Sequence, residues 1–159
     1  MGYTHYWYKN RDFTNTEWAA VKTLARTFLE HLPDHSASAG GYYIEEKLEL
    51  AFDYDAPDVP VAIDASQIRF NGLGDLGHET FVLLKQPSKF NFCKTTRKPY
   101  DFAVCGVLLI AQKQAPEVLN IHSDGGPDDW MPVRRHLQAL FQESFYLPPA
   151  VTEEISQGA

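Results

Sequence analysis

The chain begins with the pattern of a strand and continues with that of a helix. Residues 3–8, "YTHYWY", alternate between two sides with a period of two, which predicts a strand rich in aromatic side chains. Thr14 and Glu17 have the spacing of a capping box, in which each side chain bonds the other residue's backbone amide. Apolar residues then recur at helical spacing from Trp18 until Pro33 interrupts the pattern. The sequence therefore predicts an amphipathic helix between Thr14 and Pro33.

Glycine, proline and small polar residues divide the middle of the chain into short elements. Loops are predicted for residues 34–43 and 53–60, and the pattern of residues 44–52 between them fits either a strand or a helix. Two strand-like runs, near residues 67–70 and 78–85, flank a glycine-rich turn. Such an arrangement predicts a β-hairpin.

The most apolar stretch of the chain lies in its second half. A helix is predicted to begin near Pro99, because proline fits the first helical turn, and to run to about residue 111. This helix is apolar on nearly every side, so it should be buried at the centre of the molecule. A last strand at residues 117–123, a loop, and an amphipathic helix over residues 131–145 complete the pattern.

These elements predict the fold class α+β, with a mixed or mainly antiparallel sheet, a central buried helix and two flanking amphipathic helices. The chain has 159 residues, of which 44% are hydrophobic, and a domain of this size buries roughly 70% of the surface of its unfolded chain. We therefore expect a single domain over residues 1–147 and a flexible C-terminal tail over residues 148–159.

Composition favours a cytoplasmic protein. Cys93 and Cys105 form no Cys-x-x-Cys motif, so we expect neither a disulfide framework nor a structural zinc site. The longest apolar run is about half as long as a segment that spans a bilayer, and the N-terminus lacks the pattern of a secretion signal. We expect no secretion and no association with membranes.

Positive charge is concentrated in one part of the chain. Five cations follow one another with no acid between them, namely Lys85, Lys89, Lys94, Arg97 and Lys98. They contribute +5 to a net charge of −7, which leaves −12 for the rest of the chain. An acidic protein lacks the broad basic face of a general nucleic-acid binder, whereas a small anionic ligand needs only a local site.

Residues 94–98, which we call the basic segment, directly precede the predicted central helix. Lys94, Thr95, Arg97 and Lys98 could together neutralise an anion, since a helix N-terminus adds unpaired amides and partial positive charge. The structural alternative is that threonine caps the helix, arginine pairs with a carboxylate and the lysines lie in solvent. The leading hypothesis is a protein that binds a small anionic ligand, either a nucleotide or a phosphorylated metabolite.

Other residues would complete such a site. Tyr100, or a tyrosine of the first strand such as Tyr6, could contact the ring of a nucleotide, although aromatic residues on strands more often serve packing alone. Asp124 or Glu79 could recognise a hydroxyl or amino group of the ligand.

A second hypothesis is a small metal-assisted hydrolase or phosphodiesterase. His5 or His122 would act as the base, and Asp124 or Glu79 would orient it or bind the metal. No motif requires a metal or any other cofactor, so we assign no metal ligands, and these side chains could equally bond within the sheet or face water. A third hypothesis is an interaction module that binds a macromolecule through an aromatic and basic surface, and a homodimer is also compatible with the pattern.

Two further motifs have structural explanations. Gly72, Gly74 and Gly77 have the G-x-G-x-x-G spacing of phosphate-binding loops, but they precede a strand instead of a helix, and tight turns need glycine. Cys93 has cationic neighbours that could lower the pKa of a nucleophilic thiol. No cysteine-hydrolase signature surrounds it, however, and cysteine is commonly a buried residue, as we expect of Cys105.

Three segments of the sequence carry a resemblance to a family. "MGYTHYW" at residues 1–7, "RFNG" at 69–72 and "FCKTTRKPYD" at 92–101 resemble segments of small bacterial and phage proteins. The resemblance covers the chain from residue 1 to about residue 125, and no activity, cofactor or catalytic residue comes with it. The link to phages implies a role in interfering with nucleotide-based host defence, which no particular residue supports.

Overall fold

The computed structural model describes residues 2–33, 36–37, 43–44, 48–86 and 90–151. Its helices are α1 (Asn15–Glu30), the short 3₁₀ helix η1 (Gly74–Leu76), α2 (Asp101–Gln114) and α3 (Pro127–Phe141). Its strands are β1 (Thr4–Lys9), β2 (Ser36–Ala37), β3 (Tyr43–Ile44), β4 (Leu50–Ala51), β5 (Ala62–Ile63), β6 (Gln67–Gly72), β7 (Phe81–Leu84), β8 (Phe90–Lys94) and β9 (Leu119–Ser123). The fold class is α+β, as predicted.

The strands described here pair in antiparallel fashion. Strand β1 lies in the middle of a three-stranded sheet, between β8 and β9. Strand β6 pairs with β4, β5 and β7 in a second sheet, and its pairing with β7 confirms the predicted hairpin. The alternation predicted for the first strand is also confirmed, because His5 and Trp7 are buried whereas Tyr6 and Tyr8 lie on the opposite side of the sheet.

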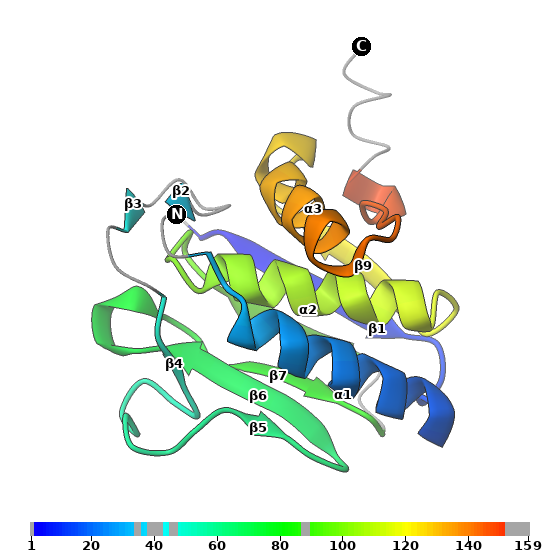
Figure 1. The fold of residues 1–159 in the computed structure, drawn as a ribbon, viewed down its shortest axis with the longest axis horizontal. Coiled ribbons are helices and arrows are strands. Elements are labelled where there is room, and N and C mark those ends of the chain that lie inside the picture. The colour runs from blue at the N-terminus through cyan, green and yellow to red at the C-terminus, as the bar shows by residue number, and fades with distance from the viewer. Residues whose placement is uncertain (1, 34–35, 38–42, 45–47, 87–89, 152–159) are drawn as a thin grey trace.

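Helix α2 is the centre of the hydrophobic core. Every residue from Asp101 to Ala111 is buried. Helices α1 and α3 pack against α2 on either side, and β1 and β9 lie behind it (Figure 1). Gly106 provides the close approach between α1 and α2, since a Cβ atom at this position would lie 2.1 Å from the Cζ atom of Phe28. The prediction of a central apolar helix is therefore correct.

The start of α1 has the predicted capping box. The Glu17 amide donates to Thr14 Oγ1 at 3.1 Å, and the Thr14 amide donates to Glu17 Oε1 at 2.9 Å. Arg11 adds two hydrogen bonds to the same carboxylate, at 2.8 and 3.0 Å. These bonds, first those from Arg11 and then that from the Thr14 amide, lower the pKa of Glu17 from 4.5 to about 2.

We predict that Glu17→Gln lowers the free energy of unfolding by about 1 kcal/mol at neutral pH. The pKa of Glu17 is lower in the folded than in the unfolded protein. Its contribution to stability is therefore complete above about pH 4.5 and is lost as the pH falls toward 2. Urea denaturation at several pH values should show the two proteins converging across this range. If the difference in unfolding free energy between the two proteins stayed constant down to about pH 2, this account would be wrong.

Several boundaries differ from the sequence prediction. Residues 90–94, for which no strand was predicted, form β8 on the edge of the sheet beside β1. Helix α3 begins at Pro127, inside the predicted loop, because proline fits the first turn of a helix. The packed part of the chain also extends beyond the predicted domain end at residue 147, because Val151 is buried in the core. Residues 152–159 of the predicted tail lie outside the described residues.

The predicted loop at residues 34–43 falls mostly outside the described part of the chain, which there includes β2 and the first residue of β3. Of the unassigned residues 44–52, Leu50 and Ala51 form β4.

No helix among the described residues has both the length and the apolar character needed to cross a membrane.

Candidate functional site

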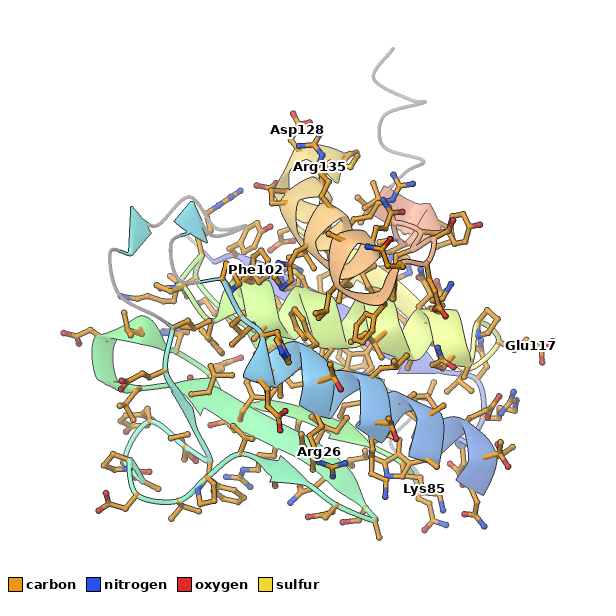
Figure 2. All side chains as sticks on the ribbon, viewed as in Figure 1. Arg26, Lys85, Phe102, Glu117, Asp128 and Arg135 are labelled. Atoms are coloured by element: carbon orange, nitrogen blue, oxygen red, sulfur yellow. The ribbon has the colours of Figure 1, made fainter. Side chains whose placement is uncertain are left out.

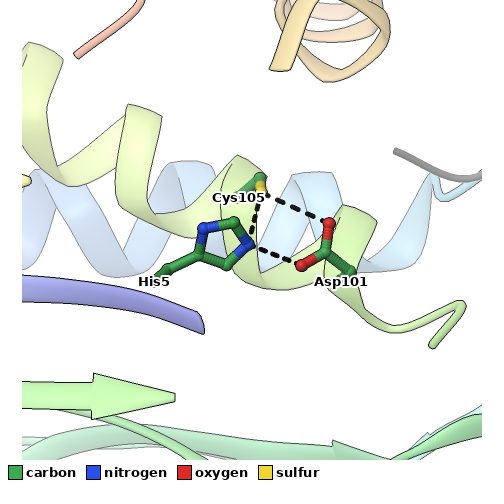
Figure 3. A group of neighbouring side chains, drawn as sticks. All are labelled: His5, Asp101 and Cys105. Carbon is green, nitrogen blue, oxygen red and sulfur yellow. Dashed lines mark hydrogen bonds and ion pairs between the residues drawn. The ribbon is translucent and has the colours of Figure 1, made fainter. Parts of the chain in front are cut away.

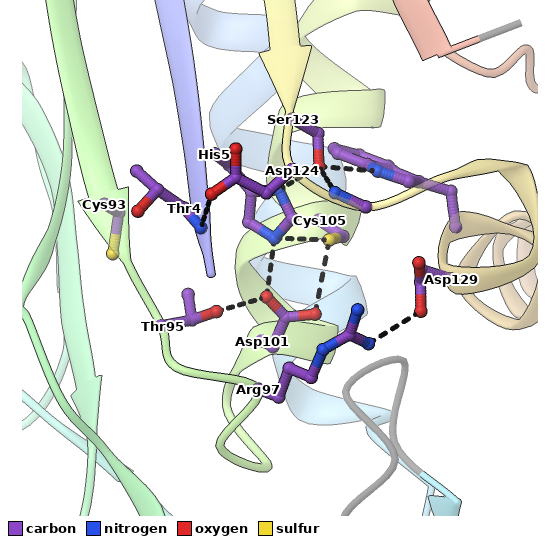
Figure 4. Close-up of polar contacts among 12 residues, drawn as sticks. Thr4, His5, Cys93, Thr95, Arg97, Asp101, Cys105, Ser123, Asp124 and Asp129 are labelled. Carbon is purple, nitrogen blue, oxygen red and sulfur yellow. Dashed lines mark hydrogen bonds and ion pairs between the residues drawn. The ribbon is translucent and has the colours of Figure 1, made fainter. Parts of the chain in front are cut away.

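Three chain segments that are distant in sequence meet at one end of α2. They are the start of β1, the connection from β8 into α2, and the connection from β9 into α3. Each contributes polar side chains to a group that we call the polar cluster (Figure 4). Its members are His5, Thr95, Asp101, Cys105 and Ser123, all of them buried.

Short hydrogen bonds join the polar cluster. His5 Nδ1 lies 2.8 Å from Ser123 Oγ, and His5 Nε2 lies 2.6 Å from Asp101 Oδ1. The hydroxyl of Thr95 donates to the same Asp101 oxygen, also at 2.6 Å. Two donors therefore meet one carboxylate oxygen in the interior, where an unpaired charge would be costly.

The bonds around Ser123 determine where the proton of His5 lies. Ser123 Oγ accepts hydrogen bonds from the Gly125 amide at 2.9 Å and from Trp130 Nε1 at 3.2 Å. These two bonds fill both lone pairs of the oxygen, so the hydroxyl hydrogen of Ser123 must point to His5 Nδ1. The imidazole then carries its proton on Nε2 and donates it to Asp101.

Asp101 is placed where its negative charge is stabilised. It is the first residue of α2, at the end of the helix where the backbone dipole favours an anion. Besides His5 and Thr95, the thiol of Cys105 lies 3.7 Å from the second carboxylate oxygen. The charge of Asp101 also helps to raise the pKa of Arg97, after the larger effect of the Arg97–Asp129 hydrogen bond.

The order of bonds from Ser123 through His5 to Asp101 is that of a serine nucleophile system, with the two imidazole nitrogens exchanged. A nucleophilic oxygen needs a free lone pair to attack its substrate. Both lone pairs of Ser123 are engaged, so the serine is not free to attack in this arrangement. We therefore assign the polar cluster a positioning role, in which it fixes the start of β1 and α2 and the end of β9.

The same side chains also resemble a metal site. Potential ligand atoms of His5, Asp101 and Cys105 lie within 4.8 Å of one another (Figure 3). Coordination, however, would need the Nε2 lone pair of His5, and this nitrogen carries the proton. Moving the proton to Nδ1 would direct a third donor at Ser123 Oγ and leave the serine hydrogen without an acceptor. The cluster as arranged thus fits proton sharing better than a resident metal.

The cysteines lie inside the protein. Burial raises the pKa of Cys93 to about 12, and its thiol lies 3.4 Å from the carbonyl oxygen of Glu79. Burial likewise raises the pKa of Cys105. These environments favour the structural interpretation of both residues, since a reactive cysteine needs a low pKa and access to solvent.

We predict that neither thiol of the folded protein reacts with iodoacetamide at about pH 8, because so little thiolate is present and both sulfurs are buried. Mass spectrometry should show no alkylation without denaturant and two alkylated cysteines in urea. Rapid modification of Cys93 in the folded protein would instead support a nucleophilic role.

The basic segment has an unusual backbone. Thr96 and Arg97 have φ angles of 54° and 58°, in the left-handed region that residues other than glycine rarely adopt. For a β-branched threonine such a conformation is a genuine outlier. The amides of Thr95 and Thr96 both donate to the carbonyl of Tyr3, at 3.1 and 3.2 Å, and hold the segment against β1.

Arg97 is displayed at the surface by this backbone. Its guanidinium lies over the ring of Tyr3, 3.9 Å from the centroid, and donates to Asp129 Oδ1 at 2.8 Å. Asp129 Oδ2 also accepts the Gly126 amide at 2.9 Å, at the N-terminus of α3. The hydroxyl oxygens of Tyr3 and Thr96 are buried without a hydrogen-bond partner. Burial, above all, raises the pKa of Tyr3.

The remaining predicted ligand residues are divided between the core and the surface. Tyr100 is completely buried, and its hydroxyl donates to the Glu79 carbonyl, so its ring is not presented to a ligand. Thr95 is equally buried and serves the polar cluster. Lys94 and Lys98 are partly exposed, and Lys94 lies at the end of β8 on the same side of the sheet as Phe92.

The predicted catalytic residues do not converge. His5 faces the core, whereas His122 lies on the opposite side of the sheet, stacked parallel to Tyr6 with ring centroids 6.0 Å apart. Asp124 Oδ2 accepts the Thr4 amide at 3.0 Å, and Glu79 Oε1 accepts the Lys94 amide at 2.7 Å. The carboxylate beside His5 is Asp101, which the sequence hypothesis did not include.

A local signal for Asp101 did exist. Asp101 and Cys105 are four residues apart, so they share one face of the helix that begins at this point. Nothing in the spacing indicated that this face meets His5.

No family model matches the chain, and no curated protein or solved structure shows significant similarity to it.

Proposed function

We propose that the protein binds a small anionic ligand, a nucleotide or another phosphorylated metabolite, at the basic segment. The observation that carries the proposal is the pair of left-handed residues Thr96 and Arg97. Strained backbone of this kind costs of order 1–3 kcal/mol per residue and persists only where the surrounding structure enforces it. Such strain occurs preferentially at functional sites. We therefore infer that the turn has a binding role.

The polar cluster helps to hold the turn in this strained conformation. Thr95, the residue before the strained pair, is anchored to Asp101 through its side chain and to Tyr3 through its amide. The Lys98 amide closes the turn by donating to the Thr95 carbonyl at 3.0 Å. Removal of the cluster would therefore allow the turn to relax.

The strained turn and Tyr3, which packs against it, carry groups that suit an anion. Arg97 offers a guanidinium, which binds phosphate or carboxylate oxygens through two parallel hydrogen bonds. The hydroxyls of Tyr3 and Thr96 are donors without acceptors, and an anionic oxygen would satisfy them. Lys94 and Lys98 add positive charge within the same segment.

Asp129 occupies the position that we propose for the ligand's anionic group. Its carboxylate accepts from Arg97 and from the Gly126 amide, and it lies at the positive end of the α3 dipole. A ligand phosphate would compete with this carboxylate for the same donors. In this proposal Asp129 preorganises Arg97 and is displaced when the ligand binds.

We predict that Arg97→Gln weakens binding of inorganic pyrophosphate at least about tenfold, because it removes charge-assisted hydrogen bonds worth roughly 1.5–3 kcal/mol. Isothermal titration calorimetry would measure the affinity, and native mass spectrometry would identify any anion that copurifies. Arg135→Gln is the matched control, since Arg135 is exposed on the outward side of α3 (Figure 2). Equal loss in both variants, or no binding to the unmodified protein, would contradict the proposal.

A further inference from the structure

The outer side of the sheet formed by β8, β1 and β9 carries a group of aromatic rings, which we call the aromatic face. Its members are Tyr6, Tyr8, Phe90, Phe92 and His122. Tyr8 and Phe90 are each 45% exposed and Phe92 is 50% exposed. Large apolar side chains that are exposed next to one another mark binding surfaces in soluble proteins.

Neighbouring rings of the aromatic face lie close together, both between β1 and β8 and along β8. Tyr8 and Phe90 have ring centroids 4.9 Å apart, and Phe90 and Phe92 have centroids 6.0 Å apart. The register places Tyr6 opposite Phe92 and Tyr8 opposite Phe90. The face therefore offers two successive cross-strand pairs of rings along β1 and β8.

Positive charge lies at one end of this face. Lys94 follows Phe92 by two residues on the same side of β8, opposite Thr4. Among the outward positions of these three strands that the structure describes, Lys94 carries the only fixed charge. The row of rings thus ends at Lys94, the first residue of the basic segment.

We propose that the aromatic face stacks the bases of a short single-stranded oligonucleotide whose terminal phosphate lies at the basic segment. The inference rests on the proposed function and specifies its ligand. Uncharged rings beside a cationic end complement flat bases that are joined to phosphate, and stacking on aromatic side chains accepts any base. The two cross-strand pairs of rings provide room for two bases.

The charge of the rest of the protein restricts the length of this ligand. The chain outside its basic run carries −12, which repels a long polyanion. A dinucleotide to tetranucleotide touches only the rings and the basic segment. We therefore expect affinity to stop increasing beyond a few nucleotides.

Calorimetric titration with 5′-phosphorylated thymidine tetranucleotide and with inorganic pyrophosphate tests this inference. The tetranucleotide should bind about tenfold more tightly than pyrophosphate, and Phe92→Ser or Phe90→Ser should remove that advantage without changing pyrophosphate binding. Tyr146→Ser is the matched control, because Tyr146 is 65% exposed in a different part of the protein.

The outcomes separate the two proposals. Equal affinity for both compounds, or no effect of the phenylalanine variants, would overturn the inference and leave the proposed function intact. If neither compound binds, both proposals are wrong. A dimer that Phe92→Ser dissociates would show that a second copy of the chain covers the aromatic face, and it would overturn the inference as well.

Discussion

His5→Ala is expected to lower the free energy of unfolding by about 3–5 kcal/mol, because it leaves the buried charge of Asp101 without its imidazole donor. The substitution removes the 2.6 Å bond to Asp101 and leaves a carboxylate in the core with the Thr95 hydroxyl as its closest remaining donor. It also deprives the Ser123 hydroxyl of its acceptor at Nδ1. Urea denaturation followed by circular dichroism would measure the loss.

His122→Ala is the appropriate control, since it removes the same side chain from the outer side of the same sheet. We expect it to cost less than about 1 kcal/mol. The double variant His5→Ala/Asp101→Ala should lose less than the sum of the single variants, because no unpaired carboxylate remains. A small effect of His5→Ala, or additivity of the pair, would show that the polar cluster does not act as a unit.

Gly106→Ala should destabilise the protein by about 2–3 kcal/mol, in contrast to its effect in an ordinary helix. Alanine favours a helix over glycine by roughly 1 kcal/mol, so a net loss would report steric overlap. The new Cβ atom would lie 2.1 and 2.2 Å from ring carbons of Phe28, and both residues are in the tightly packed contact of α1 with α2. Thermal unfolding would detect the change.

A smaller residue on the opposing helix should relieve the overlap. Phe28→Leu alone creates a cavity and is destabilising, but combined with Gly106→Ala it should recover part of the lost stability. Gly126→Ala serves as the control, because a Cβ atom at Gly126 would contact nothing within 4 Å. A neutral or stabilising Gly106→Ala would mean that the helices separate easily at this point.

Elements with local signals could be predicted from the sequence. The capping box identified the start of α1, and the alternation of "YTHYWY" identified the strand β1, although aromatic residues on both of its sides left open which side is buried. The glycine-rich turn likewise identified the hairpin of β6 and β7. In each of these cases the residues that determine the structure are neighbours in the chain.

Features that depend on distant partners could not be predicted in this way. Strand β8 was missed because "FNFCK" pairs with β1, which lies more than 80 residues earlier. His5 was selected as a candidate for its chemistry, but its partners Asp101 and Ser123 come from α2 and β9. The spacing of residues along a chain contains no information about which strand edges and helix ends meet.

The location of β1 also has a consequence for synthesis on the ribosome. This strand is made before both of its neighbours, β8 and β9, which lie in the second half of the chain. At a synthesis rate of about 5–20 residues per second, β1 waits several seconds with Trp7 unprotected until residues 90–123 have emerged. Such long-range pairing slows folding, so the nascent chain should depend on chaperones more than a protein whose first strand pairs with its second.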